Sequence, residues 1–112
     1  MYYKVLDKNE KGELTSTMMK GKDSITYKIG EFSETTKWGK IRDLGIYICF
    51  TKEQSQHYID LVKKEGIVDV SNWNIYEVET QGEVKQFGNW FMCDMVKVIN
   101  TPLAQFGRAE NL

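Results

Sequence analysis

The side chains that could carry chemistry begin with Asp94, which interrupts an otherwise apolar stretch between Trp90 and Val98. A carboxylate within an apolar strand costs free energy unless a partner compensates it. Asp94 is therefore a candidate site acid. The alternatives are a bulge or twist of the strand at this position, or a lysine facing Asp94 from a neighbouring strand.

Two further carboxylates, Glu77 and Glu79, are separated by one residue. We expect them on opposite sides of a strand, where they do not converge on one atom as the two carboxylates of a glycosidase must. With Tyr47 and Asp94 they make up the candidate ligand residues if the domain binds a small molecule or nucleotide beside its central strands.

The segment Glu77-Val78-Glu79 also resembles the Glu-x-Glu of mono-ADP-ribosyltransferases, with Thr15-Ser16-Thr17 standing for the Ser/Thr-rich strand of that family. The resemblance implies an ADP-ribosyltransferase-like domain as an alternative function. The chain departs from the pattern on its first strand, which offers Lys4 where the family has arginine or histidine.

Other chemistries lack the residues that they need. His57 is the only histidine and falls at the margin of a helix face, which is typical of a surface position rather than a general base. Cys49 and Cys93 lie in apolar runs about forty residues apart and do not make a zinc set; we expect buried thiols. The glycines occur singly, so no phosphate-binding loop is present. We expect no metal and no cofactor.

The charge balance disfavours nucleic acid as a partner. Fifteen Lys and Arg stand against sixteen Asp and Glu, which gives a net charge of −1. Only Arg42 and Arg108 are arginines, whereas planar recognition of phosphate or guanine prefers Arg over Lys. No apolar run approaches the ~20 residues of a membrane span, and we expect neither a signal peptide nor a membrane anchor.

Aromatic residues next to turns are the best candidates for a contact surface with another protein. Tryptophan beside a turn is often half exposed, and interfaces use exposed aromatics as anchors, although core rims use them too. The candidate binding residues are Trp38, Trp73, Trp90 and Phe106. We expect the surface at the 30–44 loop that carries Trp38 and the turn that carries Trp90.

The elements that must position these residues predict one α+β domain over 1–102 and a tail over 103–112. Alternating and apolar runs predict about six to seven mostly antiparallel strands. The first three form a meander ending near residue 29, and 45–50 is the central strand, covered on both faces. Two more follow at 74–80 and 83–87, and 90–100 is the longest strand.

One main helix over residues 52–65 is expected to pack on one face of the sheet. Thr51 and Gln54 have the spacing of a capping box, and Gly66 supplies the left-handed residue at the other end. Ile67 is expected to fold back on Val62, as in a Schellman motif.

The layout is similar to small proteins encoded by bacteriophages and prophages. The segments that carry this resemblance are 2–5, 45–51 leading into the helix, and 77–84 before a strand ending at 96–98. The resemblance implies a non-enzymatic viral protein in the cytoplasm of a host cell. It would bind a host protein and inhibit a bacterial defence system such as CRISPR-Cas, and it could also form a homodimer.

Overall fold

The computed structural model describes residues 2–17, 24–35, 45–88 and 90–99. These ranges hold one helix and nine strands in two antiparallel sheets, which confirms the predicted α+β class with a dominant sheet. Trp38, Phe106 and the expected tail 103–112 lie outside the described residues.

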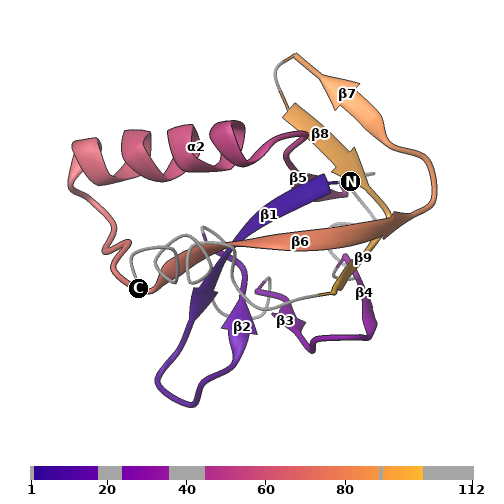
Figure 1. The fold of residues 1–112 in the computed structure, drawn as a ribbon, viewed down its shortest axis with the longest axis horizontal. Helices are drawn as coiled ribbons and strands as arrows, with labels where there is room; N and C mark the ends of the chain where they lie inside the picture. The colour runs from indigo at the N-terminus through magenta and orange to yellow at the C-terminus, as the bar shows by residue number, and fades with distance from the viewer. Residues whose placement is uncertain (1, 18–23, 36–44, 89, 100–112) are drawn as a thin grey trace, which may run out of the picture.

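The larger sheet has six strands in the order β3-β2-β1-β6-β9-β4, and the smaller has three in the order β5-β8-β7. Figure 1 shows helix α2 alongside β1 and β6, with the small sheet beyond one end of the large one. In chain order the elements are β1 (Tyr2–Lys8), β2 (Leu14–Thr15), β3 (Thr26–Tyr27), β4 (Phe32–Glu34), β5 (Ile46–Ile48), α2 (Lys52–Glu65), β6 (Trp73–Gln81), β7 (Lys85–Phe87), β8 (Trp90–Cys93) and β9 (Met95–Val98).

The predicted meander is confirmed, because β1 pairs with β2 and β2 with β3, both antiparallel. The predicted central strand is wrong. The run 45–50 contributes β5, which is an edge strand of the small sheet. Its apolar residues alternate in exposure: Ile46 and Ile48 are buried, whereas Tyr47 between them is 48% exposed. Only one face of this strand is therefore covered, and β1 and β6 hold the middle of the large sheet instead.

The predicted long strand 90–100 is also wrong, because the chain bends at Asp94 and divides it into β8 and β9, which belong to different sheets. Cys93 and Val96, three residues apart, both face the same core cluster. In an unbroken strand they would face opposite sides, so the bend inverts the facing of the chain. This confirms the alternative of a bulge or twist at Asp94.

The large sheet curls until its two edges approach each other. β3 and β4 are joined by a short turn in which Glu31 N–H donates to Lys28 O at 3.1 Å, and Gly30 N–H donates to Val98 O at 2.7 Å. The concave side encloses the main core together with the small sheet. That core consists of Leu6, Leu14, Tyr27, Ile46, Ile48, Tyr76, Val78, Cys93, Val96 and Val98.

The convex side carries the helix. Val5, Trp73 and Ile75 of the sheet are buried with Val62 of α2, and Tyr58 and Ile59 pack against this second cluster. Helix bounds match the prediction. Thr51 Oγ1 accepts from Gln54 N–H at 3.0 Å, and Gly66 ends the helix at φ 71°.

Two details of the helix ends differ from the prediction. Gln54 Oε1 accepts from Phe50 N–H at 2.7 Å, so the side chain reaches one residue further back than a capping box requires. Ile67 is 85% exposed and does not fold back on Val62. The glycine alone satisfies the last carbonyls, through Gly66 N–H to Val62 O and Lys63 O.

Candidate binding surface

Four aromatic rings form a row that runs from the helix-side core to the surface of the small sheet. Trp73 on β6 stacks on Tyr58 of α2, with ring centroids 5.6 Å apart and planes at 20°. Tyr58 meets Trp90 of β8 edge to face at 6.2 Å. Trp90 in turn contacts Tyr47 of β5 at 5.6 Å and 68°. We call these four residues the aromatic row.

Strand register brings the outer half of the row together. Tyr47 pairs with Met92 across β5 and β8, and Trp90 lies two residues before Met92, so all three face the same side of the small sheet. Ile48 and Phe91 face the other side, toward the main core or its edge. The covered face holds the small sheet in place while its other face presents Tyr47 and Trp90.

The two ends of the row differ in exposure. Trp90 is 52% exposed and Tyr47 48% exposed, so the prediction of Trp90 as a surface aromatic is confirmed. Trp73 is only 5% exposed, and its assignment to the binding surface is wrong. The polar residues before Trp73 suggested a loop, but the residue opens β6 beneath the helix.

A second aromatic group lies at the adjacent end of the small sheet. Phe50 stacks on Tyr2 at 5.3 Å and packs on Phe91 at 4.0 Å, and Phe50 is 44% exposed. Phe91 and Trp90 are successive residues of β8 and therefore point to opposite faces. Exposed aromatic surface is thus present on both sides of this end of the molecule.

The candidate ligand residues are not gathered into one site. Tyr47 belongs to the aromatic row, Glu79 forms an ion pair with Lys97 at 2.9 Å, and Asp94 lies exposed. An added Cβ on Gly82 would meet Asp94 Oδ2, so this carboxylate covers a glycine rather than lining a cavity. Asp94 is therefore better described as part of the bend between the sheets than as a site acid.

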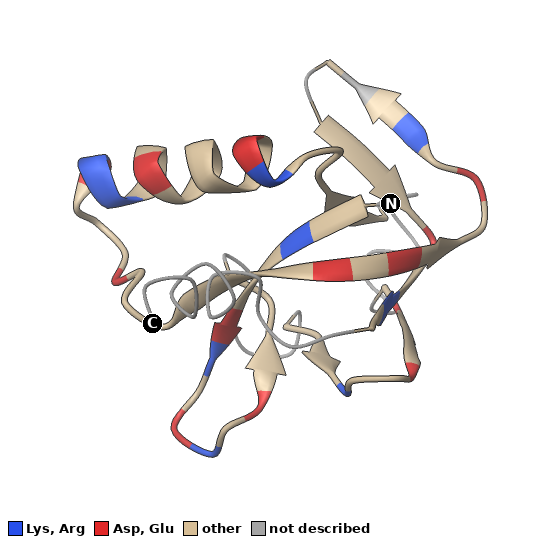
Figure 2. Cartoon of the chain, in the orientation of Figure 1, with Lys and Arg blue, Asp and Glu red and all other residues tan. Residues whose placement is uncertain are grey.

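The expectation for Glu77 and Glu79 is wrong. Residues two apart in a strand share a face, and both glutamates follow Trp73 and Ile75 on the convex side of β6, where Figure 2 shows two acidic positions along the strand. Lys4 alternates with Val5 and so faces the concave side. The sheet itself therefore separates Lys4 from the Glu-x-Glu segment.

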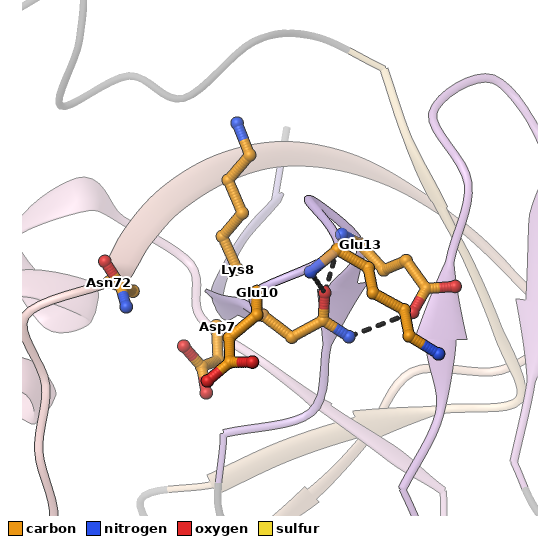
Figure 3. A pocket seen from close by; sticks show the side chains of 7 residues that line it. Asp7, Lys8, Glu10, Glu13 and Asn72 are labelled. Carbon is orange, nitrogen blue, oxygen red and sulfur yellow. Dashed lines mark hydrogen bonds between the residues drawn. The ribbon is translucent and has the colours of Figure 1, made fainter.

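A polar hollow of about 430 Å³ lies at the hairpin between β1 and β2, lined by Asp7, Lys8, Asn9, Glu10, Lys11, Glu13 and Asn72. Figure 3 shows that its hydrogen bonds are internal to the hairpin. Asn9 Oδ1 accepts from the N–H groups of Lys11 and Glu13, both at 2.9 Å, and Asn9 Nδ2 donates to Glu13 Oε1. These contacts build the turn and leave no convergent set for a ligand.

The prediction of a surface position for His57 is confirmed, because it is exposed on α2. Cys93 is buried and Cys49 half-buried, both as free thiols. Within the described ranges, no three His, Cys, Asp or Glu side chains are grouped as metal ligands would be. Over the same ranges, the one helix is too short and too polar to cross a membrane.

Lys4 is the residue that sequence reasoning missed. Its Nζ donates to Tyr47 O at 2.6 Å and so connects β1 of the large sheet to β5 of the small one. Burial lowers the pKa of Lys4 from 10.5 to about 8, against the opposing effect of the Cys49 and Cys93 thiols. The signal was present in the alternation of Tyr2, Lys4 and Leu6, which places all three on one face.

Comparison with protein-family models, with curated proteins and with solved structures found no match to this chain.

Proposed function

We propose that the protein is a non-enzymatic binding module that contacts another protein through the exposed half of the aromatic row, Tyr47 and Trp90. The observation that carries the proposal is the pair of half-exposed rings held edge to face at 5.6 Å on the open face of a three-stranded sheet. Trp and Tyr are enriched among the residues that dominate interface energies. Rings already held by neighbours lose little entropy on binding.

The support of these rings favours binding over a purely structural role. Tyr47 and Trp90 lie at the outer end of a row whose inner end is anchored by buried Trp73, so the surface is rigid although it is exposed. A rigid exposed aromatic pair is the usual form of an interface anchor. The scattered positions of Glu77, Glu79 and Asp94 give no comparable support to a small-ligand site.

A host protein is the partner that the phage-like layout predicts, and inhibition of a bacterial defence system such as CRISPR-Cas in the host cytoplasm is the corresponding biological role. Self-association through the same surface is the second partner to test. In that case the sedimentation coefficient would rise with protein concentration, and replacing Trp90 would abolish the rise.

The test is affinity capture from lysate with a matched control. The double variant Tyr47→Ser/Trp90→Ser removes the exposed pair, and Ile67→Ser removes an apolar side chain that is 85% exposed and outside the row. A partner identified by mass spectrometry should bind the wild type and the Ile67→Ser variant equally. It should bind the double variant at least 30-fold more weakly, the equivalent of about 2 kcal/mol for an interface hot spot.

Equal capture by the double variant, or no specific partner for the wild type, would contradict the proposal. Both variants should first show the wild-type circular dichroism spectrum, so that a loss of binding is not a loss of fold.

A further inference from the structure

Lys4 occupies an inward position in the middle of β1. Leu6, two residues along, lies fully buried in the main core, and Tyr76, the partner of Lys4 across β1 and β6, is 1% exposed. The Lys4 stem therefore follows the concave side of the curled sheet. The side chain as a whole is half-buried, so its end remains accessible from solvent.

The surroundings of the amine are neutral. Nζ donates to a backbone carbonyl, Tyr47 O, and lies 5.9 Å from the ring centroid of Tyr27. Burial raises the pKa of Cys93 to about 11 and raises that of Tyr27 as well, so neither side chain supplies a negative charge near neutral pH. Among the described residues, no carboxylate forms an ion pair with Lys4. This arrangement favours the uncharged amine, which is the nucleophilic form.

We propose that Lys4 is an amine site that takes small aldehydes as imines. The geometry that supports it is an enclosed but accessible Nζ held by one neutral acceptor, Tyr47 O, and bordered by a ring and two thiols rather than by carboxylates.

The reaction balances without an oxidant or reductant. The nitrogen lone pair of the neutral amine attacks the aldehyde carbon and forms a carbinolamine, and the former carbonyl oxygen then leaves as water while the C=N bond forms. One amine and one aldehyde give one imine and one water. A protonated imine keeps an N–H that can still donate to Tyr47 O, so the contact between the two sheets survives the reaction.

The size of the effect follows from the fraction of neutral amine. At pH 7.5 an amine with a pKa of about 8 is roughly one quarter neutral, whereas an ordinary lysine amine is about 0.1% neutral. Protonation alone therefore favours Lys4 by roughly 200-fold. The lower intrinsic nucleophilicity of a weaker base reduces this advantage, and we expect Lys4 to react at least tenfold faster than an exposed lysine.

The experiment treats the whole wild-type protein at pH 7.5 with limiting propanal and cyanoborohydride, which reduces each imine to a stable secondary amine. Peptide mass spectrometry then gives the labelling rate at Lys4 and at Lys63 and Lys64, which are exposed on α2 and serve as internal controls. Fragment ions separate Lys4 from the α-amine at the chain start. The expected result is labelling at Lys4 at least tenfold faster than at Lys63, with a rate that levels off above pH 8.

Two further measurements make the result decisive. In 8 M urea the preference for Lys4 should disappear, because it depends on the folded environment. The variant Lys4→Arg should lose labelling at residue 4 and leave Lys63 unchanged. Equal rates at Lys4 and Lys63 in the folded protein, or a preference that persists in urea, would overturn the proposal. Neither outcome depends on the aromatic pair binding a partner.

Discussion

Trp73 and Trp90 are the same residue type at opposite ends of one row of rings, and the fold gives them different roles. Trp73 is 5% exposed between β6 and α2, and Trp90 is 52% exposed on β8. Tyr58 contacts both, through stacking on Trp73 and an edge contact to Trp90. The inner tryptophan stabilises the helix on the sheet, and the outer one is available to a partner.

The comparison teaches that exposure, not proximity to a turn, separates a structural aromatic from a binding one. It also identifies a cost at the inner end. The indole N–H of Trp73 is buried and has no acceptor among the described residues. An unmade hydrogen bond of this kind costs about 1–3 kcal/mol, which burial of the large ring must exceed.

The largest effect is expected for Trp73→Ala, which should lower the free energy of unfolding by about 3–5 kcal/mol, as for other buried aromatics cut to alanine. The control is Trp90→Ala, where half of the ring is already in water, with an expected loss below about 1.5 kcal/mol. Urea denaturation measures both. Similar losses at the two positions would contradict the division of the row into an inner and an outer end.

A smaller effect is expected for Thr51→Ala, because Thr51 Oγ1 satisfies the Gln54 N–H at the start of the helix that carries Tyr58. Loss of this cap should cost about 1 kcal/mol. Thr51→Ser, which keeps the hydroxyl, should remain within a few tenths of a kcal/mol of the wild type. If the row depends on the helix, tryptophan fluorescence should change in the alanine variant along with stability. An unchanged stability would show that Gln54 alone is enough to begin the helix.

The smallest effect is expected outside the row, at the ion pair of Glu79 with Lys97 on the convex face. The two side chains are 52% and 28% exposed, and pairs of this kind contribute about 0.2–1 kcal/mol. Glu79→Gln should therefore lower the free energy of unfolding by less than about 0.5 kcal/mol. Raising the salt concentration should reduce the difference from the wild type. A loss above 2 kcal/mol would mean that the charged face matters more than the aromatic row implies.

Local patterns predicted the elements whose causes are local. The helix over 52–65 follows from the Thr51 cap, the apolar face and the left-handed Gly66, and all three lie within the segment itself. The hairpins of the meander follow from turn residues beside alternating strands. Among the candidate binding residues, Trp90 was recognised because it opens a strand next to a turn.

Pairing between distant segments was not predictable in the same way. The place of β5 at an edge depends on which strands reach it, and its bridge to Tyr3 joins residues that are far apart in sequence. The bend at Asp94 depends on the chain passing from one sheet to another. The burial of Trp73 depends on where the helix comes to rest.

The sequence by itself determined the α+β class, the helix with its ends and the alternation that gives each strand two faces, because these depend on hydrogen bonds and side-chain periods within a few residues. Only the tertiary structure decided which face is buried, which tryptophan reaches solvent and what surrounds the Lys4 amine. Burial is a property of contacts between segments, and a single strand or helix does not contain that information.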